Sequence, residues 1–247
     1  MKRLKILSAC AAALFCIAAG PTSEPAQPTL DSRFTIGPEL FHDDFSSDSK
    51  NWISELENGG KIDIGRGRLD IDVPAGATVW FKPLISGPVL IEYQATAVSQ
   101  GGSNDRVSDL NCFWMARDAR NPNDLLAVHR SGVFADYNQL LTYYVGLGGN
   151  GNITTRFRRY IGSPTTRPLL SRNDLSDRAD LLRANTQQLI QLVADGPLIE
   201  FFRDGRRIFE MNDPQPYTSG WFAFRTTKSH LRIEQFRVFE LKPGSSF

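Results

Sequence analysis

Three arginines and a tyrosine lie within five residues of one short segment, GGNGNITTRFRRYIG, residues 148–162. If residues 154–161 form a β-strand, Arg156, Arg158 and Tyr160 share one face. The other face carries Phe157 and Ile161, which suit a core, together with Arg159, which does not. A guanidinium group binds a carboxylate or a sulfate through two parallel hydrogen bonds. The segment therefore predicts an anion-binding strip. The alternative is a solvated outer strand whose arginines form cross-strand ion pairs.

The residues before this strip add groups that transfer protons or hold a sugar. His129 is the candidate general base, because the ordinary pKa of histidine lies near neutrality. Tyr144 and Tyr160 are the candidate acids, since a phenol can donate a proton to a leaving oxygen. Four more residues are expected to contact the substrate: Asn111, Arg130, Tyr137 and Asn138.

Together these residue types match the requirements of β-elimination at a uronic acid. The sugar carboxylate must be neutralised, which Arg156 and Arg158 can do. A base must remove the C5 proton, and an acid must protonate the glycosidic oxygen. The match is one of composition and not of motif. It predicts a polysaccharide lyase whose partner is an acidic polysaccharide or oligosaccharide.

Two other functions stay open. A non-catalytic carbohydrate-binding module would stack sugars on tryptophan, for which Trp80, Trp114 and Trp221 are candidates, although the last two lie in apolar runs typical of a core. A glycoside hydrolase needs two carboxylates about 5–10 Å apart. No ExDxE-type strand motif is present, and the candidate carboxylates are scattered: Glu92, Asp109, Asp118 and Asp136.

The charge of the chain excludes several partners. With 28 basic and 27 acidic residues the formal net charge is +1, so no global field attracts nucleic acid or an anionic membrane. The glycine-rich loop at residues 146–151 lacks the spacing of a phosphate-binding loop, so no nucleotide is expected. No Cys/His spacing suits zinc, and no cofactor is expected. A structural Ca²⁺ near Asp43 or Asp44 stays open, without an EF-hand pattern.

The N-terminus predicts export. Residues 1–20, MKRLKILSACAAALFCIAAG, have the basic start and apolar run of a secretory signal peptide. The run is short for a transmembrane helix. The sequence LSAC resembles a bacterial lipobox, so a lipid on Cys10 is the alternative and the expected route to a membrane. Residues 21–38 are expected to form a Pro/Ser-rich tether. The protein is therefore expected to be periplasmic or extracellular, and Cys112, the remaining cysteine, to be a buried small hydrophobe.

From residue 39 to residue 247 the pattern predicts a single all-β domain. Short segments of alternating or β-rich sequence follow one another, and Asp195-Gly196 and Asp204-Gly205 are typical hairpin turns. Residues 170–185 are expected to form a short helix or helical loop. Without a βαβ rhythm, the arrangement predicts an antiparallel β-sandwich or jelly roll.

Three segments resemble a known superfamily. They are LFHDDFSSDSKNWISE at the start, GRLDIDVP in the middle and GWFAFRTTKSHLRIEQFRVFEL at the end. They resemble the concanavalin-like jelly rolls of secreted bacterial glycan-acting proteins, over about residues 40–241. The central block, SDLNCFWMARD through TTRFRRY, resembles an uncharacterised branch of that superfamily, a domain of unknown function. The resemblance implies the fold and a glycan ligand, and it carries over no catalytic residue.

Overall fold

The computed structural model describes residues 33–47 and 50–243. The predicted signal peptide at residues 1–20, the alternative lipid site Cys10 and most of the predicted tether lie outside the described residues. Strand β1 (Phe34–Asp43) begins inside the tether predicted for residues 21–38. The folded domain therefore starts earlier than the sequence predicted, because this segment pairs with the last strand, β15.

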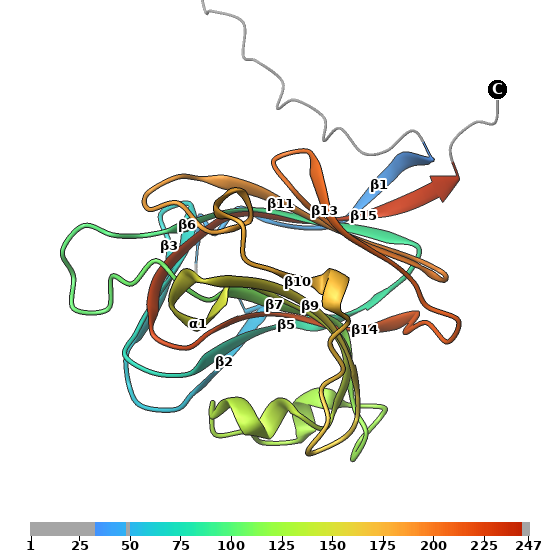
Figure 1. Ribbon diagram of the computed structural model, residues 1–247, viewed down its shortest axis with the longest axis horizontal. Helices are drawn as coiled ribbons and strands as arrows, with labels where there is room; N and C mark the ends of the chain where they lie inside the picture. Colours follow the sequence, from blue (N-terminus) through green and yellow to red (C-terminus); the bar gives the residue numbers. More distant parts are fainter. Residues whose placement is uncertain (1–32, 48–49, 244–247) are drawn as a thin grey trace, which may run out of the picture.

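Two antiparallel sheets form the domain and lie as upper and lower layers in Figure 1. The eight-stranded sheet contains β1, which pairs with β15, and, in spatial order, β13 (Arg206–Asn212), β12 (Leu198–Arg203), β11 (Gln188–Asp195), β6 (Val89–Ala97), β15 (Ser229–Pro243), β4 (Arg68–Val73) and β3 (Lys61–Gly65). The seven-stranded sheet has the order β10 (Asp174–Leu175), β9 (Thr154–Ile161), β8 (Leu140–Gly148), β7 (Leu110–Asp118), β14 (Ser219–Thr226), β5 (Ala77–Ser86) and β2 (Trp52–Leu56). The predicted all-β sandwich is confirmed.

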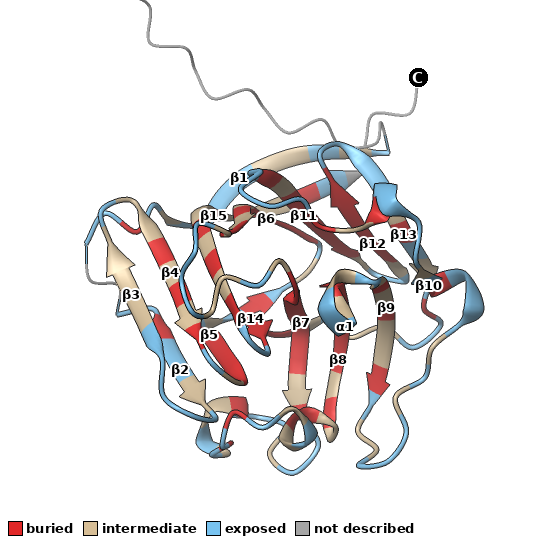
Figure 2. Cartoon of the chain, turned by 60° about the vertical axis from the view of Figure 1, so that its left-hand side comes forward, coloured by how far each residue is buried: buried red, intermediate tan, exposed pale blue. Residues whose placement is uncertain are grey.

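Strand periodicity explains the core between the sheets. In β4 every second residue is buried, and Figure 2 shows buried stretches running along the strands of both sheets. Trp52 of the edge strand β2 packs into this core, with its ring 5.3 Å from that of Phe224 and 5.0 Å from that of Phe236. The predicted turn at Asp204-Gly205 joins β12 to β13 with positive φ at both residues, as a tight hairpin requires.

The helical pieces are short. Residues 170–185 form a helical loop in which the 3-10 turns η3 (Ser171–Asn173) and η4 (Arg178–Asp180) flank β10. A single turn, α1 (Gly149–Asn152), joins β8 to β9. In the described part of the chain, no helix is long and apolar enough to cross a membrane.

The connection between β7 and β8, residues 119–139, is here called the cap. It contains the 3-10 turns η1 (Leu125–Ala127) and η2 (Phe134–Tyr137) and lies below the lower layer in Figure 1. The cap covers the outer face of the seven-stranded sheet, which is the face turned away from the core. A second apolar cluster forms there, in which Leu125 and Tyr137 of the cap contact Trp80 and Phe113 of the sheet. The cap therefore decides which part of the outer face stays open.

Candidate functional site

The register of the seven-stranded sheet aligns side chains in rows across its outer face. One row crosses β5, β14, β7, β8 and β9 in the order Thr78, Arg225, Asn111, Gly146 and Arg156. The neighbouring row contains Trp80, Ala223, Phe113, Tyr144 and Arg158. The alternation predicted for residues 154–161 is thus present, with Arg156 and Arg158 of β9 on the outer face and Phe157 in the core.

A cavity of about 310 Å³ lies over the β7–β8–β9 part of this face. Its floor comes from the two rows and contains Asn111, Tyr144, Gly146, Arg156 and Arg158. Its walls come from loops and include Phe134 of the cap, Asn150 of α1, Arg167 and Thr227. Strands thus position the floor, and the loops that join them enclose it.

Three arginines line the cavity, and they differ in their partners. Arg156 forms a two-pronged ion pair with Asp174 of β10, with N–O distances of 2.7 and 3.1 Å. Arg158 donates to the backbone carbonyl of Arg167, and the Arg167 guanidinium lies 5.0 Å from the centre of the Phe134 ring. Among the residues that the structure describes, neither Arg158 nor Arg167 has a carboxylate within ion-pair distance. Burial, together with Arg167 and Arg156, lowers the pKa of Arg158.

Polar groups beside the arginines can bind a sugar. Burial, with Tyr160 and Asp109 nearby, raises the pKa of Tyr144 far above its ordinary value, so its phenol stays neutral and can donate a hydrogen bond. Asn111 is only 2% exposed, and its Nδ2 lies 3.5 Å from Oδ1 of Asp109. Its side-chain oxygen is buried and has no hydrogen-bond partner. Such an acceptor is available to a ligand hydroxyl.

The structure brings four of the predicted site residues together: Asn111, Tyr144, Arg156 and Arg158. Tyr160 shares their face but is fully buried, with its ring 5.5 Å from that of Tyr144, and it does not line the cavity. His129 is exposed on the cap and does not line the cavity either. The sequence predicted Tyr160 as an acid and His129 as a base at one site, but neither side chain lines this cavity.

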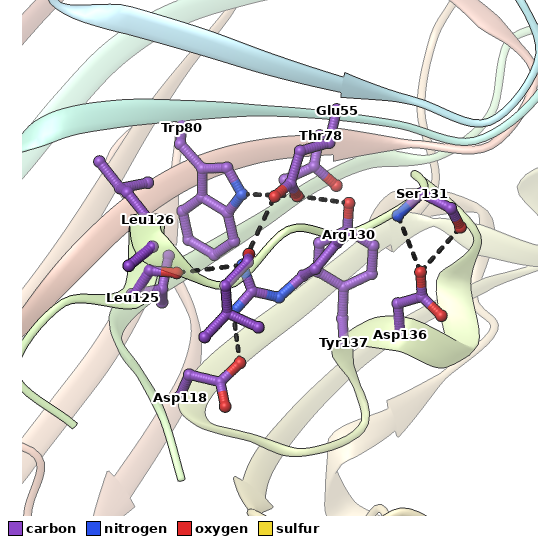
Figure 3. A network of polar contacts seen from close by, with 12 residues as sticks. Glu55, Thr78, Trp80, Asp118, Leu125, Leu126, Arg130, Ser131, Asp136 and Tyr137 are labelled. Carbon is purple, nitrogen blue, oxygen red and sulfur yellow. Dashed lines mark hydrogen bonds and ion pairs between the residues drawn. The ribbon is translucent and has the colours of Figure 1, made fainter. Parts of the chain in front are cut away.

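Arg130 and Tyr137, predicted to hold substrate, instead hold the cap on the sheet (Figure 3). The Arg130 side chain is fully buried, pairs with Asp118 and lies 3.4 Å from Oε1 of Glu55. The hydroxyl of Tyr137 donates to Oε2 of Glu55 at 2.7 Å, as does the indole nitrogen of Trp80 at 2.9 Å. Both residues are corrected from substrate binding to structural support.

Asn138 also lies outside the cavity, with its Nδ2 donating to the carbonyl of Pro164 at 3.0 Å. The three candidate stacking tryptophans are buried: Trp80, Trp114 and Trp221. None of them presents an open platform for a sugar ring. A platform-type binding surface on these tryptophans is therefore not formed.

Sequence reasoning missed Arg167, Phe134 and Arg225. Arg167 lies in the loop after β9, where no periodicity assigns a face, and it reaches the cavity only because that loop folds back. Arg225 belongs to an apolar strand and is buried under the cap. The alternation Trp221, Ala223, Arg225 in GWFAFRT could have placed it on the outer face.

The candidate carboxylates do not converge. Of the described residues that line the cavity, Asp109 alone carries a carboxylate. Asp118 pairs with Arg130, Asp136 accepts hydrogen bonds from Ser131, and Glu92 lies in the other sheet. The facing pair that a glycoside hydrolase needs is therefore not formed at this cavity.

No group of three or more metal-ligating side chains occurs within residues 33–47 and 50–243. Both carboxylate oxygens of Asp43 accept hydrogen bonds, one from the backbone of Phe45 and one from the indole of Trp52. Asp44 accepts one from the backbone of Ser46. Calcium near these residues stays a prediction.

Comparison with known proteins bears on the fold. A Bacillus subtilis protein of unknown function with a galectin-like fold superposes with a TM-score of 0.66 at 18% identity, over 85% of this chain and 99% of that one. LamA from Z. galactanivorans, in complex with laminaritriose and laminaritetraose, gives 0.54 at 11% identity, over 83% and 100%. The carbohydrate-binding module CBM66 from Bacillus subtilis gives 0.53 at 9% identity, over 78% and 98%. At these identities the similarity shows the jelly-roll fold.

A search among curated protein sequences finds no significant match to this chain. The sequence resemblance predicted an uncharacterised branch of jelly-roll proteins, a domain of unknown function, and that prediction is confirmed. Residues 71–236, which include the cap and all three strands under the cavity, match the model described as Domain of unknown function (DUF6250), and the chain belongs to that family.

Proposed function

We propose that this protein binds an acidic glycan in the cavity over β7, β8 and β9. The observation that carries the proposal is the pair Arg158 and Arg167. Both guanidinium groups line the cavity, and among the described residues neither has a carboxylate partner. In a protein of net charge +1 such a local cation cluster favours an anionic group.

Sugar binding is supported by the other lining groups. Tyr144 offers a donor, the Asn111 oxygen an unpaired acceptor, and Phe134 an aromatic ring at the wall. Such a mixture of polar groups and an aromatic side chain suits a carbohydrate pocket. Two structural neighbours also support a glycan, since one is a carbohydrate-binding module and the other is solved with laminarin oligosaccharides. Export through the predicted signal peptide at residues 1–20 belongs to the same proposal, because polysaccharides are met outside the cell.

Elimination at a uronic acid is the second candidate. It is favoured by Arg158 and Tyr144 lining one cavity, where they would neutralise a carboxylate and protonate a leaving oxygen. The raised pKa of Tyr144 suits an acid and opposes a role as base. Because His129 does not line the cavity, the lining residues supply groups to neutralise the carboxylate and to protonate the leaving oxygen, but they do not include the predicted base. Binding is therefore the function that the geometry supports best.

The test compares acidic polymers with their carboxyl-reduced forms, using affinity electrophoresis and titration calorimetry. Pectic, alginate, ulvan and glycosaminoglycan polymers form the panel. Losing a hydrogen bond to a charged group costs about 1.5–3 kcal/mol, so Arg158→Ala should weaken binding about 10- to 100-fold. Arg66→Ala removes the same charge at an exposed turn of the other sheet and should change little.

Retention of a carboxyl-reduced polymer as strong as that of its acidic parent would contradict the proposal. So would an equal loss in Arg66→Ala and Arg158→Ala. The absorbance of unsaturated uronates, followed in the same mixtures, distinguishes the second candidate. A rise that Tyr144→Phe abolishes would establish elimination, whereas retention without a rise would establish binding alone.

A further inference from the structure

We infer that the cavity receives the end of an acidic glycan chain and excludes its interior. This inference rests on the proposed function and narrows the ligand to a terminal sugar residue. It follows from the outer face being open at β9 and closed at β14. A polymer lying across the strands would have to leave the cavity on both sides, over β9 and over β14.

The closed side lies directly beside Asn111 in the row across the sheet. The next residue, Arg225, is fully buried and donates to the carbonyl of Gly132 in the cap at 2.6 Å and to the hydroxyl of Thr78 at 3.0 Å. Its guanidinium also lies 5.2 Å from the ring centre of Phe134. Side chains therefore fill the path from the cavity toward β5.

The neighbouring row is closed in the same way. Trp80 and Phe113 are fully buried, and Tyr137 of the cap stacks on Phe113 with ring centres 5.7 Å apart. The buried ion pairs of Arg130 with Asp118 and Glu55 fasten the cap at this place (Figure 3). The wall is thus part of the packed fold and not a separate surface loop.

The opposite side of the cavity is open. Arg156 of β9 is 30% exposed and its partner Asp174 of β10 is 34% exposed, so this pair marks the mouth. The cavity volume of about 310 Å³ lies at the small end of the range for ligand pockets, roughly 300–1,000 Å³. A short terminal portion of a chain fits this shape, and the rest of the chain would leave past Arg156.

The Asn111 oxygen gives the closed end a group that can recognise a chain terminus. It is buried and has no partner, and Asn111 lines the cavity next to Arg225 in the row across the sheet. A terminal sugar carries a hydroxyl that an internal sugar has used in its glycosidic bond. That hydroxyl can donate to Asn111, whereas an internal residue would bring the next sugar against the wall.

The experiment measures how many protein molecules bind each chain of a uronate series with defined lengths. Calorimetry with an acidic oligosaccharide that the protein retains should give one protein per chain at every length, and an affinity that stops rising after the first few sugars. A second set has either a reduced reducing end or an O-methylated non-reducing end. One of these two modifications should weaken binding about tenfold or more.

The inference would be overturned if the number of proteins bound per chain grew with chain length. It would also be overturned if both end-modified sets bound as tightly as the unmodified oligosaccharides. In either case the acidic oligosaccharide would still bind, so the proposed function would stand. If no acidic oligosaccharide or polymer of the panel bound, the proposed function itself would fail. The two failures are therefore distinguishable without any protein variant.

Discussion

The buried ion pair under the cap allows a quantitative prediction about stability. In Asp118→Ala the guanidinium of Arg130, fully buried, loses its closest carboxylate. Removing one partner of a buried pair costs about 3–5 kcal/mol, because the other charge is left uncompensated. Since Glu55 still lies 3.4 Å from Arg130, we expect the lower end, about 3 kcal/mol. For a domain of this size that corresponds to a melting temperature lower by about 6–12 °C.

The matched control is Asp63→Ala. Asp63 pairs with two cations, Lys61 at 3.0 Å and Arg66 at 3.4 Å, as Asp118 does with Arg120 and Arg130, but it is exposed on the other sheet. Exposed ion pairs contribute little, so this variant should melt close to the unchanged protein. Melting followed by circular dichroism, and urea unfolding at neutral pH, give the two free energies.

Hydrogen exchange locates the effect. Amides of the cap, residues 119–139, should exchange faster in Asp118→Ala, whereas those of β6 and β11 should keep their protection. Equal melting temperatures for Asp118→Ala and Asp63→Ala would refute the reasoning. The Arg130 pair would then not be what holds the cap on the sheet.

Three further predictions concern other sites. Burial opposes the charge of Asp213, but hydrogen bonds from Tyr143 and Arg159 hold its pKa below 3.8. Its contribution to stability should therefore be complete above pH 3.8 and be lost as the pH falls through the lower pKa of the folded state. Acid unfolding measures this loss. Burial raises the pKa of Cys112 to about 12, so a thiol reagent should label it only as the protein unfolds, and rapid labelling of folded protein would contradict this. In Gly146→Ala the added methyl would lie 3.0 Å from the Tyr144 hydroxyl at the cavity floor. Overpacking should lower the free energy of unfolding by about 1–3 kcal/mol in urea unfolding, and an unchanged value would contradict this.

Local periodicity was enough to predict the fold class and the orientation of β9. Because side chains alternate on a strand, the sequence alone indicated that Arg156, Arg158 and Tyr160 share a face. The hairpin turn at Asp204-Gly205 was equally local, since two adjacent residues must adopt positive φ. Composition was sufficient to exclude a global basic surface.

Long-range contacts decided the site. Arg158 and Tyr160 are two residues apart on one face, yet the first lines the cavity and the second is buried beside Phe113. Arg156 finds its carboxylate in Asp174, 18 residues away, through pairing of β9 with β10. The spacing of residues within one strand cannot predict an ion-pair partner that lies on another strand.

The cap shows the physical reason most clearly. Arg130 follows His129 in a segment without periodicity, so sequence pattern could assign neither residue a direction. The tertiary structure buries Arg130 against Asp118 and leaves His129 exposed. Which side chains share one face of a strand is a property of the local backbone, and the sequence determined it. Which part of that face stays open depends on where a distant loop folds, and only the tertiary structure decided that.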